Sequence, residues 1–144
     1  MSDVKLSNPK DAIGSGKVHL ELWPDTATVA GAMAFFEGAQ KYGRYNWRAV
    51  GVRASIYVSA ARRHIMKWWN GEECSEDNGL PHLWNALACI AILIDAAECA
   101  KLEDDRPPSA PVSKMLDHMP PLMEALTEMH KERHPHQYTI ADEV

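Results

Sequence analysis

The sequence predicts an all-α protein, a small helical bundle that is completed by association of identical chains. Apolar residues recur at helical spacing in several long segments, and glycines stand where the first two of these segments end. Only one short piece alternates in the manner of a strand. The 144 residues fit one domain, because single cores commonly run to roughly 100–150 residues.

The composition excludes several classes of protein. Hydrophobic residues make up 46% of the chain and charged residues 24%, which is typical of globular proteins and excludes a wholly disordered chain. A net charge of −5 gives no basic footprint for a nucleic-acid polymer, and no apolar run is long enough to span a membrane. Met1–Lys5 shows no secretory signal. We therefore expect a cytoplasmic protein whose three cysteines are reduced.

Three regions follow one another along the chain. Residues 1–24 are expected to be extended, because prolines and glycines interrupt them and only Val18–Leu22 alternates like a short strand. Residues 25–103 form the predicted helical domain. Residues 104–144 combine a Pro-rich linker with one amphipathic helix around 115–130, which Pro120 and Pro121 interrupt, and a tail.

The first long helix is predicted to begin at Asp25 or Thr26 and to end near Gly43, the kind of residue that follows a helix end. Glu37 and Lys41 lie one turn apart on one of its faces. A neighbouring face is an apolar stripe formed by Val29, Met33 and Phe36.

Two further helices complete the predicted domain, one over residues 55–69 and one from Pro81 to about Ala100. The inward face of the second helix is expected to consist of Val58, Ala61, Ile65 and either Trp68 or Trp69. The third helix is apolar nearly all round, and three helices of one small chain scarcely cover it. We therefore expect a homodimer or a homotetramer.

The loop between the second and third helices is strongly acidic. Crowded carboxylates repel one another unless a cation neutralises them, and Mg²⁺ or Mn²⁺ accepts carboxylate oxygens, with histidine suiting Mn²⁺ better. The candidate metal ligands are Glu37, Glu72, Glu73, Glu76, Asp77 and His82. The alternative is an exposed acidic loop in which Asp77 or Asn78 caps the third helix.

The second helix also carries a basic face. Arg63 and Lys67 lie one turn apart beside His64, and like charges at this spacing favour an anion between them. The alternative is a basic face that is simply solvated.

Residues 41–48 interleave aromatic, basic and amide side chains. An aromatic ring can stack on a nucleobase and an amide can hydrogen-bond its edge, so Asn46 and Trp47 are candidate base-binding residues. Alternatively, the aromatic rings fasten this loop to the core.

Four motifs follow one another along the chain: NPKDAIG over residues 8–14, EGAQKYGRYNWR over 37–48, RHIMKWWNGEE over 63–73, and DNGLPHL over 77–83. In this order they resemble the phage dATP/dGTP diphosphohydrolase family of MazG-like nucleotide pyrophosphohydrolases, over about residues 8–100. The resemblance implies a MazG/HisE-like helical bundle. The chain departs from the wider MazG pattern, because its second helix carries basic residues where carboxylates are expected.

The resemblance also implies an activity: hydrolysis of a purine (deoxy)nucleoside triphosphate, dGTP or GTP with dATP as a further substrate, to monophosphate and pyrophosphate. Two or three Mg²⁺ or Mn²⁺ ions would take part. Some phage members of the family are similar to MazZ, which supplies dGMP for replacement of adenine by 2-aminoadenine in phage DNA. The location would then be the cytoplasm of the host cell.

On this resemblance, Glu37, Asp77 and His64 are the expected catalytic residues. The carboxylates would hold metal ions that activate a water for attack on the α-phosphorus, and His64 or His82 would orient that water or bind metal. The phosphate-binding residues would be Lys10, Lys17, Lys41, Arg63 and Lys67.

Two alternatives remain open at this point. One is a non-catalytic helical phage protein that binds a nucleotide or a host protein through the same basic face and the C-terminal helix. The other is a HisE-like phosphoribosyl-ATP pyrophosphohydrolase, which releases the same leaving group from a different substrate.

Overall fold

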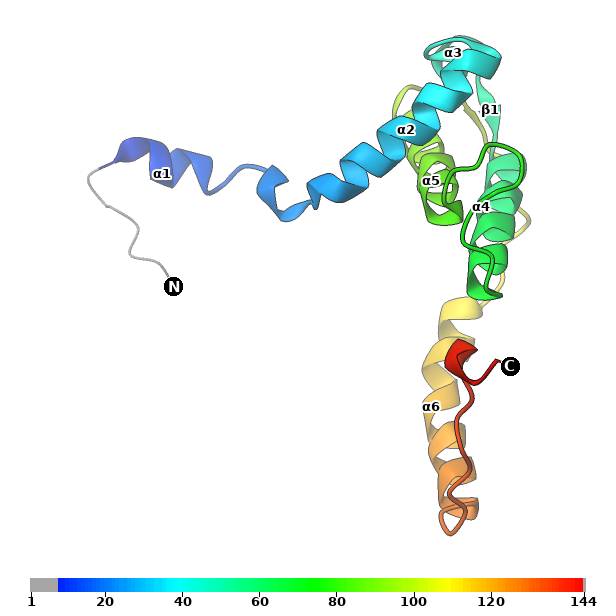
Figure 1. Cartoon of the computed structure of the whole chain (residues 1–144). Coiled ribbons are helices and arrows are strands. Elements are labelled where there is room, and N and C mark those ends of the chain that lie inside the picture. The colour runs from blue at the N-terminus through cyan, green and yellow to red at the C-terminus, as the bar shows by residue number, and fades with distance from the viewer. Residues whose placement is uncertain (1–7, 144) are drawn as a thin grey trace. The chain divides into compact units, whose positions relative to one another are not determined.

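The structure is a computed structural model that describes residues 8–143, so Met1–Lys5 lie outside the described residues. Helices dominate it (Figure 1), which confirms the all-α class. The chain divides into two compact units, the first ending at Asp104 and the second beginning at Asp105. None of the described helices is both long and apolar enough to cross a membrane.

The N-terminal segment contains a short helix that the sequence analysis did not predict. Helix α1 (Pro9–Gly14) begins where the side chain of Asn8 accepts a hydrogen bond from the amide of Lys10. The expected short strand over Val18–Leu22 is wrong, because Leu20–Leu22 form a 3₁₀ helix instead. No strand pairs with this segment in residues 8–143, and hydrogen bonds within the turn satisfy its backbone.

Helix α2 (Asp25–Tyr42) has the bounds that the sequence predicts, and Gly43 follows it with a φ of 87°. Its buried residues are the small ones, Ala30 and Ala34. The apolar stripe remains exposed in the single chain and consists of Val29, Met33 and Phe36. The face of α2 that contacts α5 (His82–Glu98) is therefore made of small residues.

Helix α3 (Asn46–Val50) was expected to be a loop. The carboxylate of Asp95 on α5 accepts hydrogen bonds from the Trp47 indole at 2.7 Å and from two nitrogens of Arg48 at 2.8 Å. The guanidinium of Arg48 and then the indole of Trp47 hold the pKa of Asp95 far below its usual range. This contact, made by residues nearly fifty positions apart, fastens α3 to α5.

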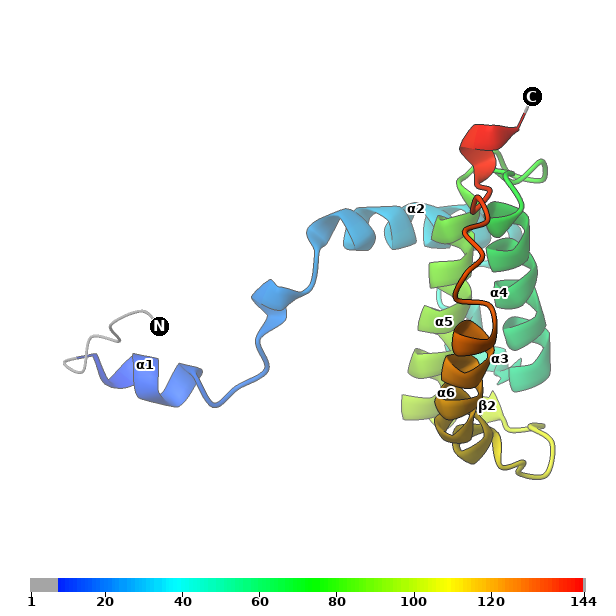
Figure 2. The same ribbon diagram turned by 90° about the horizontal axis from the view of Figure 1, so that it is seen from below.

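Helices α4 (Ala54–Trp69) and α5 (His82–Glu98) lie side by side in both views (Figures 1 and 2). Strands β1 (Val52–Arg53) and β2 (Leu102–Glu103) pair in parallel at one end of the two helices. His64 contacts His82 toward the other end, so α4 and α5 run antiparallel. Both helices lie close to their predicted bounds. The buried apolar residues that they share are all alanines: Ala54, Ala61, Ala86 and Ala96.

The inward face predicted for α4 is wrong for the single chain. Of its predicted members only Ala61 is buried, whereas the larger Val58, Ile65, Trp68 and Trp69 are exposed. Methyl side chains let the two helix backbones approach closely, and the large apolar side chains lie on faces that the chain itself does not cover.

Helix α6 (Val112–Met129) belongs to the second unit. The expected interruption is wrong, because the helix continues through Pro120 and Pro121. A proline within a helix leaves the carbonyl four residues earlier without its partner, and the exposed surface of α6 lets water satisfy these groups. The tail contains a 3₁₀ turn over Ile140–Asp142, capped by Thr139.

Gly51 offers a test of how closely the chain before α4 approaches the chain after α5. It has a φ of 80°, and a Cβ there would lie 2.9 Å from the backbone oxygen of Lys101. Gly51→Ala should therefore lower the free energy of unfolding by about 1–3 kcal/mol, measured by urea denaturation. In the control Gly38→Ala the new methyl meets nothing within 4 Å inside α2, and it should raise that free energy by about 0.5–1 kcal/mol. Equal effects of the two substitutions would contradict the contact.

Candidate functional site

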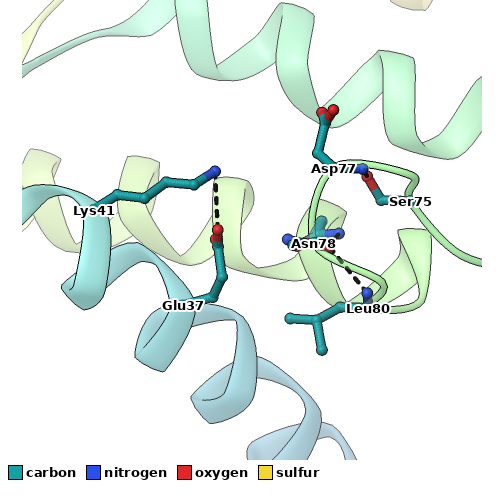
Figure 3. Close-up of polar contacts among 7 residues, drawn as sticks. Glu37, Lys41, Ser75, Asp77, Asn78 and Leu80 are labelled. Carbon is teal, nitrogen blue, oxygen red and sulfur yellow. Dashed lines mark hydrogen bonds and ion pairs between the residues drawn. The ribbon is translucent and has the colours of Figure 1, made fainter.

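Some of the predicted site residues lie on the C-terminal half of α2, on α4 and on the loop between α4 and α5. Figure 3 shows the side chains of Glu37 and Lys41 extending from α2 toward the loop that carries Asp77, whose carboxylate points toward α4. The charge of Asp77 acts on both Lys41 and His64. Glu37, Lys41 and Asp77 thus border one space between α2, the loop and α4, which we call the cleft, and the charge of Asp77 links His64 of α4 to it.

Glu37 and Lys41 form an ion pair within α2. Their Oε1 and Nζ atoms lie 2.9 Å apart, as the spacing of four residues allows. The hydrogen bond to Glu37 raises the pKa of Lys41, and the charge of Asp77 acts in the same direction. The ammonium of Lys41 is therefore the positive charge that two carboxylates of the cleft share.

The loop that carries Asp77 is folded by its own hydrogen bonds (Figure 3). The amide of Ser75 donates to the carbonyl of Leu80 at 2.9 Å, and the amide of Gly79 donates to the carbonyl of Ser75 at 2.8 Å. The amide of Asp77 donates to the Ser75 hydroxyl at 3.3 Å, and that of Leu80 donates to the side-chain oxygen of Asn78 at 3.0 Å. These bonds fix the backbone of Asp77 and leave its side chain exposed.

A pair of amide side chains ties this loop to α5. Asn78 donates to the Oδ1 of Asn85 at 3.1 Å, and Asn85 donates in return to the Oδ1 of Asn78 at 3.3 Å. Asn85 is 8% exposed, so the pair extends into the protein interior. The candidate set of the sequence analysis does not include Asn85. The sequence feature that could have indicated Asn85 is an amide within a helix of mostly apolar residues.

His64 and His82 meet between α4 and the start of α5. Their Nδ1 atoms lie 2.9 Å apart, and His82 is completely buried. Nε2 of His82 lies 3.5 Å from Oε1 of Glu72, and this buried nitrogen makes no hydrogen bond within residues 8–143. Burial lowers the pKa of His64, as do the neighbouring His82 and the cations Lys67 and Arg63, while Asp77 opposes them. His64 therefore favours its neutral form.

The predicted phosphate-binding residues are not all in one place. Arg63 and Lys67 lie on the exposed part of α4 next to His64, and Nη1 of Arg63 bonds the Ser59 hydroxyl at 2.8 Å. Lys10 lies in α1 and Lys17 in the chain after it. Within residues 8–143, the side chains of these two lysines make no hydrogen bond or ion pair with residues of the cleft.

Trp47 and Asn46 lie in α3, away from the acidic loop along the chain. Besides its bond to Asp95, the Trp47 ring meets Phe35 edge-on, with 5.0 Å between centroids. Trp47 also lines an open, largely apolar pocket of about 830 Å³ between α2 and α5, whose other aromatic walls are Trp23, Phe35, Phe36 and Tyr45.

Two carboxylates of the cleft match one way in which proteins bind Mg²⁺, although they do not form a complete metal site by themselves. In residues 8–143, no three His, Cys, Asp or Glu side chains form a group that could hold a metal ion. Mg²⁺ commonly binds through one or two carboxylates while keeping waters and taking substrate phosphate oxygens. Glu37 and Asp77 face the cleft and fit this mode, whereas Glu73 and Glu76 are exposed on the loop and Glu72 contacts His82.

The amide pair gives a direct test of how the loop is held. Asn85→Leu leaves the amide of Asn78 without its partner and should lower the free energy of unfolding by about 1–3 kcal/mol. Hydrogen exchange of the Asp77 and Leu80 amides should become faster. Asn70→Ala is the matched control: its exposed amide bonds only a carbonyl of its own helix, and its effect should stay within about 0.5 kcal/mol. Unchanged exchange in Asn85→Leu would show that the pair does not hold the loop.

Comparison with known proteins gives two matches. Residues 7–106 match the family described as dATP/dGTP diphosphohydrolase, N-terminal. Over 97 residues the chain is 29% identical to the dATP/dGTP diphosphohydrolase of Salmonella phage PMBT28. This aligned stretch covers 67% of this chain and 33% of that protein. The chain thus spans about a third of the length of this curated relative. No solved structure matches the chain.

Proposed function

Since the chain belongs to the dATP/dGTP diphosphohydrolase N-terminal family, we propose that it hydrolyses purine (deoxy)nucleoside triphosphates to monophosphate and pyrophosphate. The observation that supports this proposal is the cleft, which Glu37 and Lys41 of α2 and Asp77 of the acidic loop border, with the charge of Asp77 acting on both Lys41 and His64. Acids, cations and an imidazole around one space are what hydrolysis of a phosphoric anhydride needs.

Each charged group of the cleft has a task in this reaction. Lys41, Arg63 and Lys67 offset the negative charge of the triphosphate and of the leaving pyrophosphate. Glu37 and Asp77 are the proposed ligands of Mg²⁺ or Mn²⁺, two or three ions in all. When bound, these ions would polarise the phosphate oxygens and lower the pKa of a water. His64 is the proposed acceptor of a proton from the attacking water.

The substrate preference is the finer part of the proposal. We place dGTP and GTP first and dATP after them. The name of the phage relative, which includes both purine deoxynucleotides, supports a purine base. Hydrolysis of dGTP would supply dGMP, as a MazZ-like enzyme does for phage DNA that contains 2-aminoadenine. In that case the enzyme acts in the cytoplasm of the infected host.

Product analysis tests the reaction class and the base together. The purified protein is incubated with dGTP, dATP, GTP and dCTP in Mn²⁺, Mg²⁺ or EDTA, and nucleotides and pyrophosphate are measured. We expect monophosphate and pyrophosphate from the purine nucleotides, with turnover lost in EDTA. Nucleoside and triphosphate as products would show that a different bond is cleaved. Nucleotide binding that persists in EDTA without turnover would instead favour a non-catalytic binding protein.

Substitutions test whether the cleft is the active site. Glu37→Ala and Asp77→Ala should each lower kcat by about 10²-fold or more, because each removes a carboxylate that would hold the metal ions on which the transition state depends. Their helical circular dichroism should match the wild type. Glu98→Ala removes an exposed carboxylate at the end of α5, outside the cleft, and should leave kcat unchanged. Full activity of Glu37→Ala or Asp77→Ala would remove that residue from the site.

We also propose that the active form is a homodimer or a homotetramer. A single chain leaves large apolar side chains exposed on α2 and on α4, and an open apolar pocket lies between α2 and α5; a second copy can cover such apolar surface. The exposed side chains are Val29, Met33, Phe36, Val58, Ile65 and Trp69. Identical chains meet most often through one self-complementary patch.

Light scattering after gel filtration tests the assembly. The wild type should elute with a mass of two or four chains of 16.1 kDa. Met33→Glu places a charge on the exposed stripe and should shift the mass toward one chain, because burying an unpaired carboxylate is costly. Gln40→Glu adds the same charge at another exposed position of α2 and should leave the mass unchanged. A wild type that elutes as a single chain would contradict the proposal.

A further inference from the structure

Three side chains form a line that leads from the acidic loop to the cleft. Oε1 of Glu72 lies 3.5 Å from Nε2 of His82, and Nδ1 of His82 lies 2.9 Å from Nδ1 of His64. His82 is completely buried at the centre of this line. Nε2 of His64 has no hydrogen-bond partner in residues 8–143. The line therefore begins at a carboxylate and ends at one free imidazole nitrogen.

The short contact between the two rings restricts where their protons lie. Of two imidazole nitrogens 2.9 Å apart, one must carry a hydrogen and the other a lone pair. A neutral His82 has a single N–H. Its buried Nε2 makes no hydrogen bond, but the negative charge of the Glu72 carboxylate, 3.5 Å away, favours a hydrogen over a lone pair on this nitrogen. Nδ1 of His82 is then the acceptor, and Nδ1 of His64 must be the donor.

Resting on the proposed function, we infer that Glu72 and His82 are positioning residues that hold His64 as its Nδ1–H tautomer, with Nε2 as the acceptor for the attacking water. Which nitrogen of a catalytic histidine carries the hydrogen is commonly set by the partner of its other nitrogen. Here that partner is a second histidine, which Glu72 orients in turn.

The competing arrangement is a charged His82 that donates from both nitrogens. Within residues 8–143, it would place a cation at a fully buried ring whose one ion-pair contact is 3.5 Å long, forms no hydrogen bond and comes from a partly exposed side chain. The cations Arg63 and Lys67 already act on the adjoining His64. This environment disfavours another positive charge, so the neutral pair is the arrangement that the structure supports.

The tautomer decides what His64 does in the reaction. As the water oxygen bonds to the α-phosphorus, the bond from that phosphorus to the bridging oxygen of pyrophosphate breaks. The water proton passes to Nε2 of His64, and it leaves to solvent after the products depart. The opposite tautomer presents N–H at this position and cannot accept the proton. Neither Glu72 nor His82 need touch the nucleotide.

Nitrogen NMR of the histidine rings tests this assignment without substrate or metal. In the ¹⁵N-labelled full chain at about pH 8, where histidines are mostly neutral, we expect His64 as the Nδ1–H tautomer and His82 as the Nε2–H tautomer. The exposed histidines serve as internal references, since Nε2–H predominates in water. A His64 ring in the Nε2–H form beside a doubly protonated His82 would overturn the inference.

Two pairs of variants separate positioning from mere packing. Glu72→Ala and His82→Leu remove the orienting acceptors, so the His64 tautomer should become mixed and kcat should fall at least about tenfold with little change in KM. Glu72→Gln and His82→Asn keep an acceptor oxygen and should restore both readouts in large part. An unchanged tautomer in Glu72→Ala would overturn the inference, even if His82→Leu fails to fold.

The two proposals can fail separately. If the wild type hydrolyses no nucleotide, the proposed function fails, whereas the NMR spectra still decide the tautomer. If the wild type is active and Glu72→Ala retains full kcat, the positioning role fails and the proposed function stands. Glu98→Ala serves as the matched control, and both its spectrum and its kcat should equal those of the wild type.

Discussion

The alanine-lined contact between α4 and α5 is the constraint on which the rest of the structure depends. Ala61 and Ala86 are nearly fully buried in it, and side chains of this size let two helix backbones approach closely. At one end the approach brings His64 within hydrogen-bonding distance of His82. At the other end it joins β1 to β2, where only a glycine fits beside the carbonyl of Lys101. A bulkier contact would separate both ends at once.

The same constraint leaves the single chain with a small core. Alanines bury little apolar surface, whereas a Val, Met or Phe side chain contributes about 1.5–3 kcal/mol when it is fully buried. Val29, Met33 and Phe36 contribute little of this in the single chain because each is largely exposed. Covering these three side chains would add hydrophobic stabilisation, and in the proposed homodimer or homotetramer a second copy would cover them. Folding of the chain and its association with a second copy would then be coupled.

Helical spacing was enough to predict α2, α4 and α5, and glycines marked the ends of α2 and α4, because these signals are local. Charge patterning selected Glu37, Lys41 and Asp77, which border one cleft, and His64, on which the charge of Asp77 acts; their role in a reaction stays a prediction. The buried faces could not be predicted, since apolar periodicity favours large side chains and the true contact uses alanines. Helix α3 depends on Asp95, nearly fifty residues away in the chain, and the contact between His64 and His82 depends on how α4 meets α5. Such contacts leave no local trace in the sequence.

The interactions that hold the Asp77 side of the cleft are stronger than those that hold the Glu37–Lys41 side. Asp77 belongs to a loop tied by hydrogen bonds to buried groups, and removal of one such bond leaves an unsatisfied amide, which is costly. Glu37 and Lys41, in contrast, hold each other in a partly exposed ion pair, and such pairs contribute only about 0–1 kcal/mol. Lys41 can therefore exchange Glu37 for a phosphate at little cost, and the exchange frees the carboxylate of Glu37 for a cation. Under the proposed function, a cleft with one fixed side and one exchangeable side would stay charge-balanced without ligand and would accept a triphosphate together with its metal ions.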